Sequence, residues 1–278
     1  MDTVAITDHG TMFGTVEFYE KALKAGIKPI IGCECYVAPR RLTDKTSQDA
    51  RGLNHLVLLA ENQTGYRNLC KLATAAQLEG FYYKPRIDTE ILAAHSEGLI
   101  ALSACLHGKI PRLILDNAYK KADEAARWYQ KVFGENNFFL EVQNNGIDIQ
   151  EKVNQTLRDM SARLSIPLVA SNDCHYLDRE DARAHEVLLC VQTGKTMNDP
   201  GRFKFRTDQL YFKSPAEMQA SFGDYPGALA NTVDIAARCQ IEFDFNTYHF
   251  PKFEADTGQT AAQLFEERAR AGFEDVLA

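Results

Sequence analysis

The chain has 278 residues, of which 45% are hydrophobic and 25% charged, a composition that indicates an ordinary globular protein and excludes a low-complexity one. The net charge of −7 argues against a free-standing basic DNA-binding protein, and seven cysteines, an odd number in a long chain, argue against a disulfide scaffold. No apolar run approaches the roughly 18 residues of a membrane span, and the early Asp2, Asp8 and His9 are unlike a signal peptide, so we expect a cytoplasmic protein with no membrane partner.

Short apolar runs alternate with helical patterns along the first 170 residues. The sequence predicts helices at residues 12–25, 117–133 and 149–164, and strands at residues 4–7, 30–37, 56–59, 99–102, 138–142 and 168–170. Such alternation predicts a parallel sheet with helices outside, either a (β/α) barrel or an open doubly wound sheet. The dinucleotide fingerprint G-x-G-x-x-G is absent, which disfavours the Rossmann alternative. Beyond these elements we expect a surface loop at 39–53, a helix near 227–238 and an acidic helix from about 259.

Residues of metal-binding types lie at or near the C-terminal ends of separate predicted strands: Asp8 with His9, Glu34, Cys105, Glu141, and Asp173 with His175. In (β/α) barrels this end of the strands carries the active site. Imidazole, thiolate and carboxylate together favour zinc, manganese or iron. The pattern therefore predicts a multinuclear hydrolytic site, in which metals activate water and hold phosphate oxygens.

Side-chain alternation refines this set. Asp173 and His175 are two residues apart and would face the same way in extended backbone, which predicts that Cys174 faces the core. By the same rule, Glu34 faces the opposite side of its strand from Cys33 and Cys35. Cys105 alone is more typical of a buried hydrophobic residue, and His55 is weaker on geometry because it precedes its apolar run. We expect four histidines to be ordinary surface or cap residues: His95, His107, His185 and His249.

Several short motifs match one known family. Thr7–Gly10 (TDHG), Gly32–Tyr36 (GCECY), Asn54–Leu56 (NHL), Leu102–Leu106 (LSACL) and Asn172–Tyr176 (NDCHY) resemble motifs of the PHP (polymerase and histidinol phosphatase) domain. Residues 26–32, 81–86 and 228–232 are similar to the alpha subunits of bacterial DNA polymerase III. The resemblance covers nearly the whole chain and implies a distorted, TIM-like (β/α)7 barrel with a trinuclear metal centre.

The resemblance also implies roles for individual residues. The implied metal ligands are His9, Glu34, His55, Cys105, Asp173 and His175, with Asp8, His9 and Asp173 as the catalytic group. Apart from the resemblance, Glu141 is expected to bind a metal or to support a ligand, with a salt bridge at the barrel rim as the alternative. Lys84 and Arg86, which lie beside Tyr82 and Tyr83, are candidates for contact with phosphate or DNA, because basic and aromatic side chains together suit a phosphate and a stacked base; a solvated loop is the alternative.

The family's first motif, a His-x-His on the first strand, has no counterpart here. We therefore expect a barrel that lacks its first strand and a chain that is shortened at both ends, with the carboxylates for nucleotidyl transfer elsewhere. The expected divisions are an incomplete PHP barrel at residues 1–200, its C-terminal part and a connection toward the polymerase at 201–258, and the start of the polymerase region at 259–278.

The predicted function is that of part of the alpha subunit of DNA polymerase III, with this portion acting as a metal-dependent phosphodiesterase or 3′–5′ exonuclease. The expected cofactors are zinc or manganese, up to three ions in a complete site, with magnesium at a polymerase site outside the chain. The expected partners are a DNA 3′ end, other holoenzyme subunits, a proofreading exonuclease subunit and the sliding clamp. Two alternatives remain: a stand-alone phosphatase of the histidinol-phosphatase type, which residues 202–250 argue against, and a non-catalytic platform that docks a proofreading subunit.

Overall fold

The computed structural model describes residues 1–251, 253 and 258–277, and the chain divides into two units, residues 1–241 and 242–278. Ile235 and Cys239 are buried together with residues of the sheet, so the segment that follows residue 200 packs on the first unit as far as residue 241. The boundary expected at 258 adjoins residues 254–257, which lie outside the described residues. The second unit contains the helix α11 (Ala261–Leu277). No helix in the described part of the chain is both long enough and apolar enough to cross a membrane.

A single mixed sheet of seven strands forms the centre of the first unit, in the spatial order β1-β2-β3-β5-β6-β7, with β4 paired to β2. Six of the strands were predicted from the sequence to within about two residues. Their bounds are β1 (Thr3–Ile6), β2 (Lys28–Val37), β3 (Asn54–Ala60), β4 (Arg86–Ile87), β5 (Leu99–Leu102), β6 (Phe138–Gln143) and β7 (Leu168–Ser171). The curled sheet and its helices agree with the distorted barrel expected from the sequence.

The prediction of a parallel sheet is wrong for β3, which pairs antiparallel with both β2 and β5. The connection from β2 to β3 contains only the five-residue helix α2 (Ser47–Arg51). The connection delivers the chain to the end of the sheet at which β2 stops, because Asn54 pairs with Val37, and an antiparallel pair needs no return along β2. The other described pairs, β1–β2, β2–β4, β5–β6 and β6–β7, are parallel.

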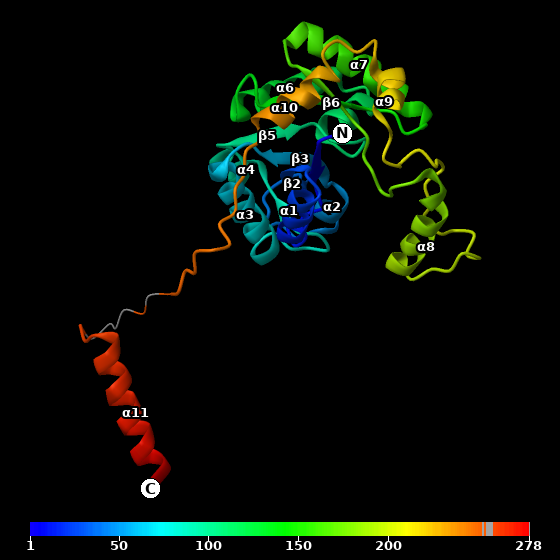
Figure 1. Ribbon diagram of the computed structural model, residues 1–278. Coiled ribbons are helices and arrows are strands. Elements are labelled where there is room, and N and C mark those ends of the chain that lie inside the picture. The colour runs from blue at the N-terminus through cyan, green and yellow to red at the C-terminus, as the bar shows by residue number, and fades with distance from the viewer. Residues whose placement is uncertain (252, 254–257, 278) are drawn as a thin grey trace. The chain divides into compact units, whose positions relative to one another are not determined.

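Helices pack against the sheet. Figure 1 shows α6 and α7 beside β5 and β6, and α1 beside β2, and α6 contacts both of these strands, α7 contacts β6 and α1 contacts β2. The bounds of the helices in the first unit are α1 (Thr15–Lys24), α2 (Ser47–Arg51), α3 (Gln63–Leu78), α4 (Thr89–Ala94), α5 (Lys109–Leu115), α6 (Tyr119–Phe133), α7 (Asp148–Leu164), α8 (Ala182–Thr193), α9 (Pro215–Phe222) and α10 (Ala230–Arg238).

The two faces of the sheet differ in what they bury. On β3, Leu56 and Leu58 face the helices in the larger apolar core, whereas Val57 and Leu59 face the inner side. Because side chains alternate along a strand, the inner side also receives Glu34, whose register partner is Val57. The outer face thus carries the larger core, and the inner face combines a smaller apolar cluster with polar side chains such as Glu34.

Close approach of β2 and β3 predicts a sensitive position at Gly32. A Cβ atom there would lie 2.5 Å from the carbonyl oxygen of Leu58, so Gly32→Ala must push the two strands apart. We expect a loss of about 1–3 kcal/mol in the free energy of unfolding, measured by chemical denaturation. Gly201→Ala is the matched control, because a Cβ at Gly201 meets nothing within 4 Å. Equal stability of the two variants would contradict the prediction.

Candidate metal centre

The first group of candidate ligands lies where β1, β2 and β3 meet. Nε2 of His9 is 3.8 Å from Oε2 of Glu34, and Nδ1 of His55 is 2.7 Å from Oε1 of Glu34. The three residues can offer ligand atoms that all lie within 4.8 Å of one another. A backbone bridge between His9 and Glu34 continues the parallel pairing of β1 and β2 and fixes this arrangement.

His55 reaches this group because β3 runs antiparallel. Its register partner is Tyr36, near the C-terminal end of β2. The N-terminal end of β3 therefore lies at the same edge of the sheet as the C-terminal end of its neighbour. A histidine that precedes its apolar run is thus brought beside Glu34, and its position in the sequence is no longer an argument against it.

Cys105 and His107 extend this group from the loop after β5. Sγ of Cys105 is 3.6 Å from Nδ1 of His55 and 3.9 Å from Nδ1 of His107, and the three residues form a second set that could hold an ion. Sequence reasoning treated His107 as an ordinary surface residue. The signal that could have found it is the Cys-x-His spacing directly after a predicted strand.

Asp173 and His175 follow β7 and form a second group. Oδ1 of Asp173 is 3.9 Å from Nδ1 of His175, which also lies 2.8 Å from the backbone oxygen of Asp173. The two side chains point the same way, but not through extended backbone, because Asp173 has a φ of 47°. This turn exposes Cys174, so the prediction that Cys174 faces the core is wrong.

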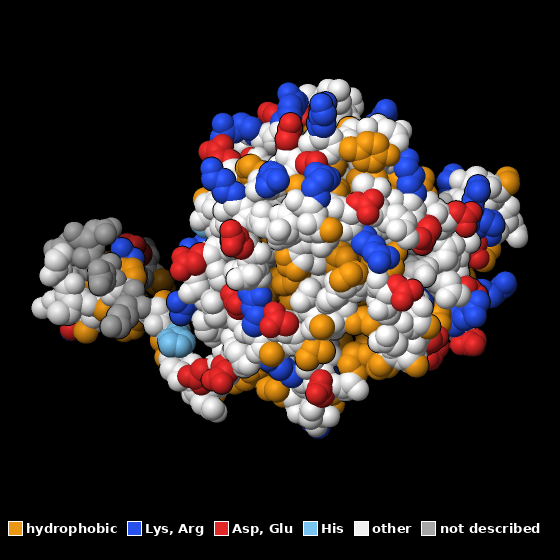
Figure 2. Space-filling model, turned by 90° about the horizontal axis from the view of Figure 1, so that it is seen from above, with side chains coloured by type: hydrophobic (Ala, Val, Ile, Leu, Met, Phe, Trp, Pro, Cys, Tyr) orange, Lys and Arg blue, Asp and Glu red, His pale blue; other side chains and the backbone are white. Residues whose placement is uncertain are grey.

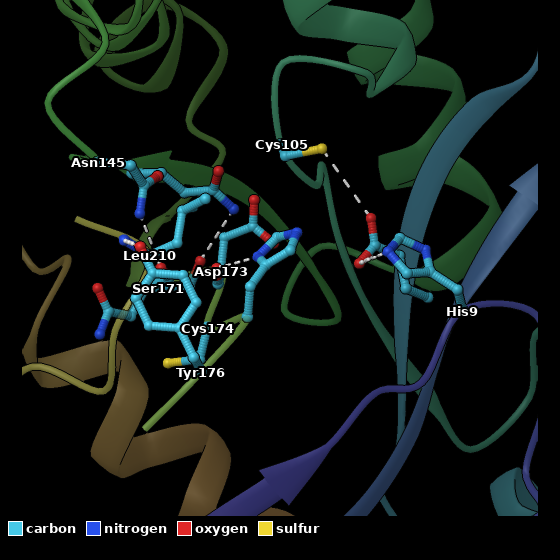
Figure 3. A network of polar contacts seen from close by, with 12 residues as sticks. His9, Cys105, Asn145, Ser171, Asp173, Cys174, Tyr176 and Leu210 are labelled. Atoms are coloured by element: carbon cyan, nitrogen blue, oxygen red, sulfur yellow. Dashed lines mark hydrogen bonds and ion pairs between the residues drawn. The ribbon is translucent and has the colours of Figure 1, made fainter. Parts of the chain in front are cut away.

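Residues of both groups line one cavity of about 590 Å³ on the inner side of the sheet, although His55 and His107 are not among its lining residues. His9, Glu34 and Cys105 contribute from one side, and Asp173 and His175 from the other. Figure 3 shows His9 and Cys105 across the cavity from Asp173. Asp8 also lines the cavity, and its backbone oxygen accepts a hydrogen bond from the amide of Glu34 at 3.1 Å. The Asp8 carboxylate belongs to neither three-residue set.

The electrostatics of the cavity suit a cation. Burial raises the pKa of the Cys105 thiol, and the negative charges of Asp173 and Glu34 raise it further. Burial likewise raises the pKa of Asp173, with Glu34 adding to the effect. Partial burial lowers the pKa of His9, which favours the neutral imidazole that binds metals. A bound cation would relieve the crowding of carboxylates and thiol, so these residues fit a metal site.

Glu141 lines the same cavity and is held by hydrogen bonds on both carboxylate oxygens. One carboxylate oxygen accepts the amide of Ala104 at 2.8 Å, and the other accepts the Ser171 hydroxyl and Nε2 of Gln143. Ala104 precedes Cys105 and has a φ of 62°, an unfavourable conformation for alanine. Ser171 lies two residues before Asp173. Glu141 therefore ties the two ligand-bearing loops together, which favours a supporting role over direct binding of a metal.

The two basic candidates differ sharply. Arg86 is completely buried, and its guanidinium donates to the backbone oxygens of Gly80, Asp44 and Leu42. It therefore fits a structural role and not the contact with phosphate expected from the sequence. Lys84 is only half-buried, with Nζ 5.5 Å from the ring centre of Tyr36. Its positive charge acts on His9, so Lys84 stands at the edge of the candidate site.

Comparison with known proteins supports one family. A family model described as "PHP domain" matches residues 1–145, just over half of the chain. DNA polymerase III subunit alpha of Treponema pallidum is 48% identical over 241 residues, covering 86% of this chain and 21% of that protein. The same subunit of Borreliella burgdorferi is 49% identical over 263 residues (89% and 23%), and that of Thermus aquaticus 46% over 276 residues (95% and 22%). The chain spans about a fifth to a quarter of the length of these relatives.

The buried carboxyl of Glu141 predicts a pH-dependent stability. Burial raises its pKa from 4.5 to about 7, so between these values the folded chain holds a proton that the unfolded chain has released. The free energy of unfolding therefore falls as the pH rises through this window. In chelator-treated protein we expect Glu141→Gln to gain stability over the wild type between pH 5 and pH 8, by up to about 3 kcal/mol. A difference in the free energy of unfolding that stays the same from pH 5 to pH 8 would contradict this prediction. Glu135→Gln, at an exposed position, is the control.

Proposed function

Because the chain belongs to the PHP domain family, we propose that it is the phosphodiesterase domain of a DNA polymerase III alpha subunit and removes nucleotides from the 3′ end of DNA. The observation that carries the proposal is the single cavity that two groups of ligand-type residues line from opposite sides. PHP domains bind metals, and the groups His9–Glu34–His55 and His55–Cys105–His107 are suited to hold them.

The proposed ligands are His9, Glu34, His55, Cys105, Asp173 and His175. When bound, zinc or manganese ions would lower the pKa of a water and offset the charge of a phosphate. The Cys105 thiol must lose its proton on metal binding, because the thiolate is the ligand form. The hydrogen bond from His55 keeps Glu34 a carboxylate despite its burial, because it lowers the pKa of Glu34. Asp8, His9 and Asp173 border the space in which the phosphate would lie.

The surface charge favours a local contact with DNA. The net charge is −7, and Figure 2 shows positive and negative side chains interspersed on the face in view, without a continuous basic field. Attraction of the DNA backbone therefore rests on individual cations such as Lys84 at the edge of the cavity. A domain of this kind would rely on the remainder of a longer protein to hold the duplex, while it acts on a single strand end.

The relatives give the proposal its wider setting. Three proteins that cover 86–95% of this chain are all called DNA polymerase III subunit alpha, which favours a domain of that subunit over a stand-alone phosphatase. DNA synthesis, its magnesium site, and partners such as a clamp or a proofreading subunit would belong to the full-length protein in the cytoplasm. The non-catalytic platform receives less support, because a structural role does not require this many ligand-type residues in one cavity.

The metal site can be tested through the thiol. Protein reconstituted with cobalt(II) should show a strong thiolate-to-metal absorption band, because a cysteine ligand contributes charge transfer that oxygen and nitrogen ligands lack. Cys105→Ser should abolish the band. Cys174→Ser is the matched control, since Cys174 lines the same cavity but is not a proposed ligand. A band that survives in Cys105→Ser would exclude Cys105 as a ligand.

The two activities of the full-length protein should be separable. Asp173→Asn should reduce 3′ excision by two or more orders of magnitude and leave DNA synthesis intact, because the groups for nucleotidyl transfer are expected elsewhere. The measurement is a gel assay on a primed template with a mismatched 3′ end. Asp178→Asn, at an exposed position nearby, serves as the control. Unchanged excision in Asp173→Asn would show that the nuclease is not in this domain.

A further inference from the structure

A second cavity, of about 530 Å³, lies between α8 and residues 205–209 and takes no part in the candidate metal centre. Three rings contribute to its wall, from Tyr176, His185 and Phe205. The rings of His185 and Phe205 are stacked, with centroids 5.8 Å apart and planes 23° apart. Its volume is within the range of cavities that hold small ligands, and flat rings of this kind are surfaces on which a nucleobase can stack.

This aromatic cavity is joined to the metal centre through His175. The ring of His175 touches Phe205 edge-on at 5.1 Å between centroids, and His185 at 5.4 Å. Backbone hydrogen bonds hold the two segments together, from the amides of His175 and Tyr176 to the oxygen of Leu210. His175, a proposed metal ligand, is therefore in direct ring contact with the aromatic wall of this cavity. A nucleotide with its phosphate beside Asp173 and His175 can reach the cavity with its base.

The charges around the aromatic cavity favour an anionic ligand. Its wall contains the carboxylates Glu186 and Asp208 and the guanidinium groups of Arg183 and Arg206. Both carboxylates are already paired with arginines outside the wall: Arg202 lies 2.6 Å from Glu186, and Arg179 lies 2.8 Å from Asp208. Arg183 and Arg206 are exposed, and within the described ranges neither forms an ion pair. The four charges of the wall itself cancel, but its two carboxylates are neutralised by arginines outside the wall, so the charges left without an ion-pair partner are the two guanidinium groups.

We propose that this cavity binds the terminal nucleotide at the 3′ end of single-stranded DNA, with the base on Phe205 and the backbone phosphates near Arg183 and Arg206. The inference rests on the proposed phosphodiesterase function, because it assigns the substrate of that site. Stacking tolerates any base, which suits an enzyme that must remove whichever nucleotide is at the end. Aromatic rings and unpaired cations beside a metal centre serve this task, whereas a purely structural cluster would gain nothing from cations at its wall.

The test uses single-stranded DNA with 2-aminopurine at its 3′ end and a phosphorothioate at the last linkage, mixed with the 278-residue chain and manganese. Stacking on an aromatic ring quenches 2-aminopurine fluorescence. We expect quenching with the wild type. With Phe205→Ala we expect the loss of quenching and a rise in Kd of about tenfold, as is typical when one stacking ring is removed. Phe205→Leu, which keeps apolar packing but lacks a flat ring, should behave in the same way.

Phe13→Ala is the control. Phe13 is 85% exposed and lines neither cavity, so its removal should leave both quenching and Kd unchanged, whereas Phe203 is unsuitable because its ring packs edge-on against Phe205. Equal quenching in the wild type and both Phe205 variants would overturn the proposal. An oligonucleotide with an abasic 3′ end that binds the wild type as tightly as the normal one would also overturn it.

Excision of an unmodified oligonucleotide, measured in parallel, separates this inference from the proposed function. If the wild type and the Phe205 variants excise with the same KM, the base subsite is wrong and the phosphodiesterase function stands. If quenching depends on Phe205 but neither manganese nor zinc supports excision, the subsite stands as a binding site and the proposed reaction is wrong. A rise in KM at unchanged kcat in the Phe205 variants would support both.

Discussion

The antiparallel pairing of β2 with β3 is the constraint on which the candidate site depends. It sets Tyr36 opposite His55 and Glu34 opposite Val57, and so places an imidazole from the start of one strand beside a carboxylate from near the end of another. Backbone hydrogen bonds fix this register, and a slip of one residue would turn Glu34 toward the apolar core. Cys33 and Cys35 already occupy that core. The geometry of the ligands is therefore set by the sheet before any metal binds.

Negative charge held at close quarters is the second feature of the site. The negative charges of three carboxylates, Glu34, Glu141 and Asp173, raise the pKa of Cys105. Glu34 also raises the pKa values of Glu141 and Asp173. Such crowding costs stability in the absence of a cation. The backbone conformations of Ala104 and Asp173 add strain at the same place, of the order of 1 kcal/mol or more each. The residues around the candidate ligands therefore destabilise the fold, and burial of apolar side chains on the outer face of the sheet compensates for this loss.

Much of the fold could be predicted from the sequence, because six strands and the longer helices have clear periodicity and end signals. The direction of β3 could not, because periodicity reports which face of a strand is buried and not which way the strand runs. The same limit made His55 look weak, whereas His107 was missed although the Cys-x-His spacing after a predicted strand was there to be read. Arg86 illustrates a different limit: its basic and aromatic surroundings predicted contact with a phosphate, but only the folded chain shows that carbonyl oxygens far apart in sequence use up its donors.

The segment that carries α8 leaves the sheet after Tyr176 and returns at Tyr211, where the two residues form a backbone bridge. Figure 1 shows α8 outside the layers formed by the sheet and its covering helices. The two ends of this segment are held together by the backbone bridge. The segment can therefore change in length or sequence with little effect on the strands, because the entropic cost of closing a loop rises only slowly with its length. Relatives of this chain could therefore differ in this segment and keep the candidate metal centre, because all of its proposed ligands precede Tyr176 in the chain.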